Sequence, residues 1–154
     1  MIAGPTTEKI LLDCARELME GVLPAVDDDT AKVRVFMLEN VLRNAAVRAA
    51  HEVAWMREET AELVAYARSV LSAGSSAPAL ARALEETDQS PSDSLHLDDV
   101  VDTYRRASEA LSCAVEAAMA AGDEERTEAG VALLESRIRR ERIVLSGWGE
   151  LAGR

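Results

Sequence analysis

One stretch decides the fold: residues 29–72 read DTAKVRVFMLENVLRNAAVRAAHEVAWMREETAELVAYARSVLS, without a glycine or a proline. Glycine and proline are the residues that most strongly oppose a helix interior, so their absence favours one continuous helix. At about 1.5 Å per residue, such a helix is roughly 65 Å long. A turn near Thr60, whose side chain could cap a second helix, is the alternative that the sequence leaves open.

The apolar side chains of this predicted helix fall on two opposite faces when successive residues are spaced about 100° apart. Two narrow charged edges separate these faces, with Lys32, Glu39, Arg43 and Arg57 on one and Arg34, Arg48 and Glu52 on the other. A helix that is apolar on two sides needs cover on both sides. The first face contains Val35, Leu38, Leu42, Ala45, Ala49, Val53, Met56, Leu63, Ala67, Val70 and Leu71, and the second contains Val33, Phe36, Met37, Val41, Val47, Ala54 and Trp55.

Residues with strong capping or stopping tendencies mark the ends of the other helices. Asp27, Asp28 and Asp29 supply an N-cap and negative charge for the long helix. Gly122 ends the helix before it and Asp123 caps the next one, which predicts a tight antiparallel hairpin. The predicted segments are a first helix capped by Thr6 or Thr7 and ended by Gly21 and Pro24, a linker at 73–97 with a short helix at 79–86, and helices at 98–121 and 124–146.

The composition supports the same fold class. Alanine and leucine carry most of the apolar content and aromatic residues make up only 3%, which is typical of packed helices rather than of sheets. We therefore predict an all-α fold with a single domain over residues 1–154. Its expected architecture is an up-and-down four-helix bundle with one unusually long central helix and a short extra helix.

The net charge of -11 argues against sequence-independent binding to nucleic acids or anionic membranes, because both need a positive field. The first residues, MIAGPTTEK, lack the basic and apolar regions of a secretory signal, and no window is apolar enough to span a membrane. A cytoplasmic location is the resulting expectation. Cys14 and Cys113 lie on or beside apolar stripes and are predicted to be buried free thiols rather than a disulfide or metal pair.

The spacings that catalysis commonly needs are absent. The chain contains no HExxH, ExxH, CxxC, Walker-type or GxGxxG sequence and no GxSxG elbow. No metal and no cofactor is therefore expected, and the sequence favours a protein that is not an enzyme without deciding the question.

Polar residues inside apolar stripes are the most informative candidates for a site. Asn40, Asn44 and His51 project from the second face of the long helix, and Glu141 continues a three–four repeat in the last helix. Because a buried carboxylate needs a partner, we predict that Glu141 hydrogen-bonds to this strip within the chain or across a dimer axis. Four alternatives stay open: a structural seam between helices or across a homodimer, a pocket that orients a small ligand, a catalytic site, and a Glu141 side chain that turns outward to Arg137. The repeat of the last helix consists of Val131, Leu134, Ile138, Glu141 and Leu145.

A second candidate is the arginine cluster near the end of the last helix, which consists of Arg137, Arg139, Arg140 and Arg142. Cations at a helix C-terminus complement the helix dipole. Four guanidinium groups over two turns could also bind a phosphate or carboxylate, which makes this cluster a weaker candidate for an anion site.

The segment ILLDCARELMEGVLPAV, followed by the acidic turn and LENVLRNAAVRAAHE, resembles a family of small uncharacterised bacterial helical proteins. Its members are encoded beside aminoglycoside-phosphotransferase-like kinases and acyl-CoA dehydrogenases, and the resemblance covers the first third of the chain. The matching features are a VLPA-type turn and an asparagine before an aliphatic pair, here Asn40, Val41 and Leu42. The Gly-Pro break of that family near residue 57 is missing here. The resemblance implies an accessory role near acyl-CoA or acyl-phosphate metabolism and carries over no catalytic residue.

The surplus apolar surface of the long helix leads to the main functional hypothesis. A bundle core uses one apolar stripe from each helix, so a second stripe needs another partner. We therefore expect a non-enzymatic interaction or accessory protein that acts as a homodimer or as the partner of an enzyme. The alternative is a helical bundle that binds a small molecule such as an acyl-CoA or an acidic metabolite, and that is possibly an enzyme.

Overall fold

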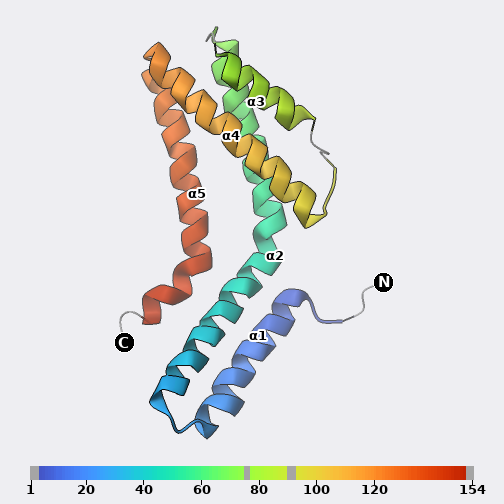
Figure 1. Cartoon of the computed structure of the whole chain (residues 1–154), viewed down its shortest axis with the longest axis vertical. Helices are drawn as coiled ribbons and strands as arrows, with labels where there is room; N and C mark the ends of the chain where they lie inside the picture. The colour runs from blue at the N-terminus through green and yellow to red at the C-terminus, as the bar shows by residue number, and fades with distance from the viewer. Residues whose placement is uncertain (1–3, 75–76, 90–92, 152–154) are drawn as a thin grey trace. The chain divides into compact units, whose positions relative to one another are not determined.

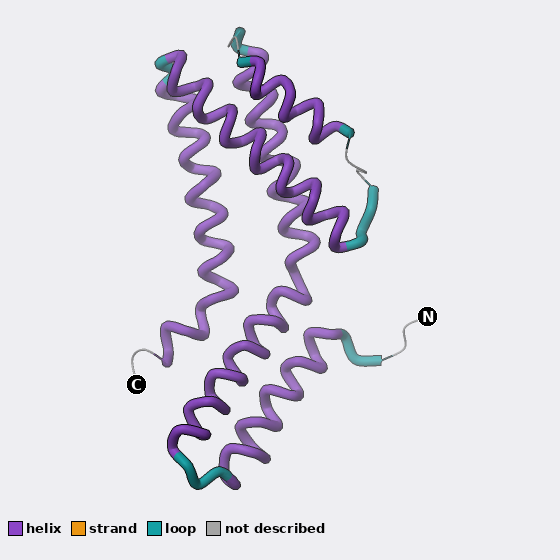
Figure 2. Tube along the Cα trace, in the orientation of Figure 1, coloured by secondary structure: helices purple, strands orange, loops and turns teal. Residues whose placement is uncertain are grey.

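The computed structural model describes residues 4–74, 77–89 and 93–151, with side chains through Val144. Every regular element in these ranges is a helix, which confirms the all-α class (Figures 1 and 2). The elements are α1 (Thr7–Glu17), a π-helical turn (Leu18–Val22), a 3-10 turn (Leu23–Ala25), α2 (Asp29–Ser72), α3 (Pro78–Asp88), α4 (Leu97–Ala121) and α5 (Glu124–Leu151).

The long helix α2 is continuous from Asp29 to Ser72, as the absence of glycine and proline predicts. Thr60 lies inside it, so the alternative turn at that position is wrong. Asp28 caps the helix: its Oδ2 accepts a hydrogen bond from the backbone N–H of Ala31 at 2.6 Å. This bond satisfies one of the backbone donors that a helix start leaves without a partner.

The other predicted helix ends also form through local bonds. Thr6 Oγ1 accepts from Lys9 N at 3.2 Å at the start of α1. Gly122 has a φ of 68°, a left-handed conformation that glycine adopts without strain, and it ends α4. Asp123 Oδ1 then accepts from Arg126 N at 3.0 Å and starts α5. The end of α5 lies beyond the predicted one, at Leu151.

The chain forms two compact units, which we describe separately. The first unit comprises residues 1–52 and 140–154, and the second comprises residues 53–139. The single-domain organisation stays a prediction.

The second unit contains the main core of the described residues. The core joins the second half of α2 to α3 and α4, and α3 packs along α4 (Figure 1). Its largest fully buried side chains are Leu63, Val70, Leu80 and Leu111. Helix α5 joins α4 through the Gly122 turn, and buried Gly130 marks a close approach: a Cβ there would lie 2.6 Å from Tyr66 Oη.

The first unit has a thin core by comparison. Helix α1 runs beside the first half of α2 (Figure 1). The apolar side chains buried in the described part of this unit are small: Ala15, Val35, Ala46 and Val144. Cys14 is exposed, so its predicted burial is wrong, whereas Cys113 in the second unit is half-buried.

Helix α5 presents a different face to its neighbours from the one that the sequence suggests. Val131, Leu134 and Ile138 are exposed, so the prediction that they form its buried stripe is wrong. The inward positions include Gly130 and Arg137, which lie one residue before Val131 and Ile138. Glu141 belongs to the same three–four repeat, and it is exposed as well.

Candidate functional site

The predicted strip of polar residues on α2 is only partly buried. Asn40 is buried, and its Oδ1 accepts a hydrogen bond from Asn44 Nδ2 at 3.0 Å, one helical turn away. His51 is exposed. The asparagines therefore contact each other along one helix, and a ligand role for the strip stays a prediction.

The prediction that Glu141 is buried is wrong. Its side chain is 60% exposed, and its Oε2 accepts a hydrogen bond from Arg48 Nη2 at 3.2 Å. The physical reason is the rotation of α5, which places position 141 at the surface, where water and Arg48 solvate the carboxylate. The alternative in which Glu141 turns outward is correct about its exposure, but the partner is Arg48 and not Arg137.

The predicted arginine cluster does not act as one group. Arg137 is turned inward and bonds to residues of α4, whereas Arg139 and Arg142 are exposed and Arg140 is half-buried. Arg137 thus has a role different from the predicted one. An anion-binding role of Arg139, Arg140 and Arg142 stays a prediction.

The buried polar cluster of the second unit is made by residues that the sequence reasoning missed. Glu59 on α2 is almost fully buried, and its Oε2 accepts a hydrogen bond from Tyr104 Oη at 2.6 Å. Arg137 Nε donates to the same Tyr104 oxygen at 3.0 Å and lies 3.6 Å from Glu59 Oε2. Its guanidinium carbon also lies 5.0 Å from the centroid of the Tyr104 ring, a cation–π distance.

The electrostatics of this cluster favour a neutral tyrosine between two opposite charges. Burial, and then the hydrogen bond to Glu59, raise the pKa of Tyr104 above its ordinary value, while the positive charge of Arg137 opposes this shift. Arg137 Nη2 bonds further to Ser108 Oγ at 3.2 Å. Because the donors of Tyr104 and Arg137 are directed at protein acceptors, the cluster is suited to holding three helices together rather than to transferring a proton.

One signal in the sequence could have found Glu59. It lies three residues after Met56 and four before Leu63, so it shares their face of α2. A carboxylate in that stripe needs a buried partner by the same reasoning that was applied to Glu141. Its partner Arg137 could not be identified, because no local spacing connects the two positions.

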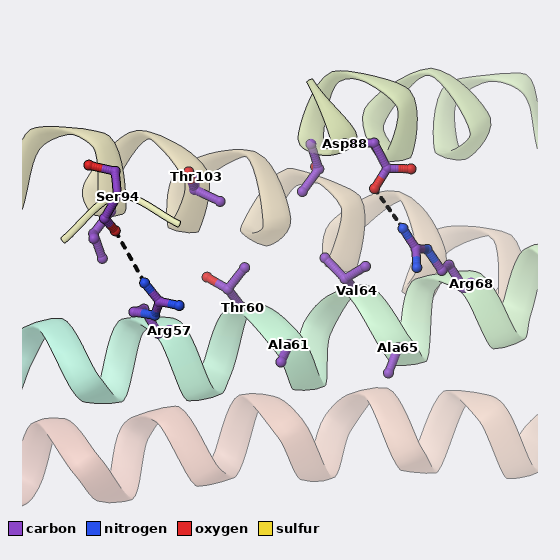
Figure 3. A pocket seen from close by; sticks show the side chains of 11 residues that line it. Arg57, Thr60, Ala61, Val64, Ala65, Arg68, Asp88, Ser94 and Thr103 are labelled. Atoms are coloured by element: carbon purple, nitrogen blue, oxygen red, sulfur yellow. Dashed lines mark hydrogen bonds and ion pairs between the residues drawn. The ribbon is translucent and has the colours of Figure 1, made fainter. Parts of the chain in front are cut away.

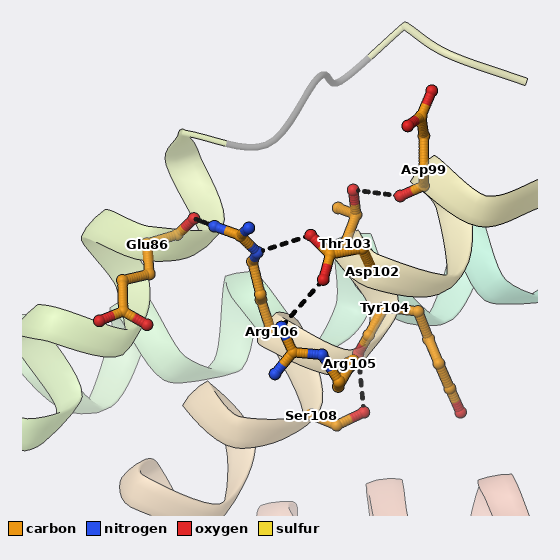
Figure 4. Close-up of polar contacts among 8 residues, drawn as sticks. All are labelled: Glu86, Asp99, Asp102, Thr103, Tyr104, Arg105, Arg106 and Ser108. Atoms are coloured by element: carbon orange, nitrogen blue, oxygen red, sulfur yellow. Dashed lines mark hydrogen bonds and ion pairs between the residues drawn. The ribbon is translucent and has the colours of Figure 1, made fainter. Parts of the chain in front are cut away.

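Polar contacts at the surface attach α3 to α4 (Figure 4). Arg106 Nε donates to Asp102 Oδ2 at 2.9 Å, and Arg106 Nη1 donates to the Glu86 carbonyl at 3.0 Å. The hydrogen bond from Arg105, with help from Arg106, holds the pKa of Asp102 below its usual value. These contacts position the end of α3 beside α2 and α4, where a cavity of the second unit lies.

This cavity is a groove of about 470 Å³ between α2, the end of α3 and the start of α4 (Figure 3). Thr60 and Val64 point into it from α2, and Val100 and Thr103 line it from α4. An arginine lies at each end. Arg57 Nη1 donates to the Ser94 carbonyl at 3.2 Å, and Arg68 Nη2 lies 2.6 Å from Asp88 Oδ1.

The first unit presents an apolar surface. Val33, Met37 and Val41 are spaced by four residues on α2 and therefore form one ridge, with Leu38 beside it. These four side chains are between 50% and 57% exposed. They belong to the two apolar faces predicted for the long helix, and nothing among the described residues covers them fully.

The described residues contain no group of three histidine, cysteine or acidic side chains that could hold a metal ion. Among the same residues, no helix combines the length and apolarity needed to cross a membrane. No protein-family model, no curated protein and no solved structure matches this chain significantly. The resemblance to the bacterial helical family stays a prediction.

Proposed function

We propose that this chain is a non-enzymatic interaction protein that self-associates through the α2 ridge, defined as Val33, Met37, Leu38 and Val41. The observation that carries this proposal is that the first unit buries its small apolar side chains and leaves larger apolar side chains half-exposed. Its buried apolar side chains are small, such as Ala15 and Ala46, while the larger ones of the ridge are half-exposed. A contiguous exposed apolar surface of this kind marks an interaction site.

The spacing of the ridge supports a helix as its partner. Residues four apart form the ridges that pack into the grooves of a second helix. The ridge from Val33 to Val41 spans eight residues, or about 12 Å. Two copies related by a two-fold axis would each supply the same surface, which satisfies the requirement for self-complementarity.

The charges beside the ridge favour a second copy in the antiparallel direction. Asp27 and Asp28 precede the ridge, and Arg48 follows it on the same side of α2. In an antiparallel pair centred on Met37, Arg48 of one copy, which is half-exposed and also bonds to Glu141 of its own chain, would approach the acidic turn of the other. Opposite charges at the rim select orientation more than they add affinity.

The expected strength of this dimer is low. Burying a side chain of this size completely contributes about 1.5–3 kcal/mol, so covering the exposed half of eight such side chains contributes about 6–12 kcal/mol. Association itself costs an estimated 4–15 kcal/mol. The two terms are similar, so the net gain is small, which predicts a weak dimer that forms at high-micromolar to millimolar concentration rather than an obligate one.

The proposal includes two finer points. The four main helices are arranged as an up-and-down bundle, with α2 as the central element. The protein acts as an accessory factor without catalysis, in keeping with a Glu59–Tyr104–Arg137 cluster whose donors bond to protein acceptors.

Sedimentation velocity from micromolar to millimolar concentration tests the proposal with two methionine variants. Met37→Lys places a charge in the ridge, and a two-fold interface contains it twice, so the dissociation constant should rise by about tenfold or more. Met119→Lys is the control, because Met119 is 62% exposed on α4 in the second unit. A wild-type chain that stays monomeric overturns self-association and favours the enzyme-partner alternative, whereas equal association of the two variants overturns the assignment of the interface to the α2 ridge.

A further inference from the structure

We propose that the groove of the second unit binds a monocarboxylate with an unbranched apolar tail, the carboxylate at Arg57 and the tail along Val64 and Val100. The groove volume of about 470 Å³ lies in the usual range of small-molecule sites. All of its lining residues lie in the second unit. This inference is therefore independent of the α2 ridge.

The Arg57 end provides the anion-binding group. A guanidinium carries five N–H donors, and the structure directs one of them, on Nη1, to the Ser94 carbonyl. Among the described residues, no carboxylate lies within ion-pair distance of Arg57. The Ser94 bond orients the guanidinium, and its other N–H groups can donate to a carboxylate in the bidentate geometry that arginine favours.

The opposite end does not offer a second free cation. Arg68 already lies 2.6 Å from Asp88 Oδ1, so its charge is neutralised. The hydroxyl groups of Thr87 and Thr103 donate to the backbone carbonyls of Ala83 and Asp99, each at 2.8 Å. They therefore offer no donor to an anion, and one carboxylate at Arg57 fits the groove better than a dicarboxylate.

The middle of the groove fits an apolar tail. Val64 lies two helical turns after Arg57 on α2, or about 10 Å along the helix. Val100 is buried on the facing helix, whereas Ala61 and Ala65 are exposed. Because the groove is open on that side, part of the tail stays in water, and we expect high-micromolar to millimolar affinity.

The charge of the whole chain opposes this ligand but does not decide the result. The net charge is -11, yet at physiological ionic strength charges farther than about 8 Å are largely screened. One opposing group that bonds to the residue beside Arg57 is Asp99, whose Oδ2 accepts from Ser94 Oγ at 2.6 Å. Its effect should weaken binding as the salt concentration falls, whereas Arg57 acts at contact distance.

Amide chemical-shift titrations in ¹H–¹⁵N spectra test the proposal with three probes. Octanoate should shift the signals of Thr60, Val64 and Val100. Acetate lacks the tail and 1-octanol lacks the charge, so each should bind about tenfold more weakly or worse. If 1-octanol binds as tightly as octanoate, the role of Arg57 is overturned. If acetate binds as tightly, the role of the apolar middle of the groove is overturned. Octanoate-induced shifts that are confined to other residues overturn the site itself.

Matched arginine variants locate the charge. Arg57→Gln should weaken octanoate binding by about tenfold, while Arg34→Gln, an exposed arginine of α2 in the first unit, should change it by less than about twofold. Equal effects of the two variants overturn the assignment to Arg57. Thr60→Trp, which fills the groove, should abolish the octanoate shifts in a folded chain, and unchanged binding to this variant would also overturn the site.

Discussion

Tyr104 Oη lies 2.6 Å from Glu59 Oε2 and donates its hydrogen to a carboxylate that is almost fully buried between α2 and α4. Arg137 of α5 bonds to the same tyrosine oxygen at 3.0 Å. The three side chains come from three helices of the second unit, and together they satisfy an acid that would be costly to bury alone. This cluster explains why Arg137, rather than an apolar residue, faces inward on α5.

Glu59→Gln should lower the free energy of unfolding by about 1–3 kcal/mol, because it leaves Arg137 partly buried without a counter-charge. Urea denaturation followed by circular dichroism at neutral pH measures the loss. Glu135→Gln, at an exposed position of α5 in the same unit, serves as the control and should change stability by less than about 0.5 kcal/mol.

Glu141→Gln extends the comparison to an exposed ion pair. Arg48 and Glu141 are both about half-exposed, so their bond should contribute less than about 1 kcal/mol. A loss at position 141 as large as the loss at position 59 would contradict the burial argument, because it would mean that the exposed pair is as important as the enclosed one.

Both tyrosines of the chain should titrate above their ordinary pKa of about 10. Burial is the main cause for each, with the negative charge of Asp123 adding to the pKa of Tyr66 and the hydrogen bond to Glu59 adding to the pKa of Tyr104. Each folded tyrosine holds its proton more tightly than the unfolded chain does. Its stabilising contribution is therefore complete below about pH 10 and is lost as the pH rises through the folded pKa.

Ultraviolet titration of phenolate absorbance measures both groups, and Tyr66→Phe and Tyr104→Phe separate them. In denaturant the midpoints should return to the ordinary value. A folded Tyr104 that ionises at that value would show that its hydrogen bond to Glu59 does not persist in solution.

Gly130→Ala should destabilise the second unit by about 1–3 kcal/mol, although alanine is the better helix former by about 1 kcal/mol. The new Cβ would lie 2.6 Å from both Tyr66 Oη and Val115 Cγ2, and one of the helices would have to shift. Thermal unfolding measures the effect. Adding Tyr66→Phe removes one of the two clashes and should restore part of the loss.

Ala132→Gly is the matched control for helix propensity, because position 132 is exposed on the same helix. It should cost about 1 kcal/mol, so alanine should be favoured at position 132 and disfavoured at position 130. An increase in stability on Gly130→Ala would mean that α5 does not approach Tyr66 as closely as the structure indicates.

The ends and the continuity of the helices could be predicted because they depend on neighbours in the sequence. Asp28, Asp123 and Thr6 bond to backbone groups three residues away, and Gly122 ends α4 through its own conformation. The Asn40–Asn44 bond is likewise one helical turn long. For such features the chain itself brings the partners together, so local physical chemistry determines them.

The face that α5 buries was decided only by the tertiary structure. On α5 the apolar repeat of Val131, Leu134 and Ile138 is more hydrophobic than the face that is turned inward, yet these residues are exposed. Gly130 permits close contact with Tyr66, and Arg137 meets Glu59, which lies 78 positions earlier in the sequence. An apolar stripe shows which surface can be buried, whereas the partners, the close contacts and the polar pairs select which surface is buried. The sequence alone contains no record of those distances.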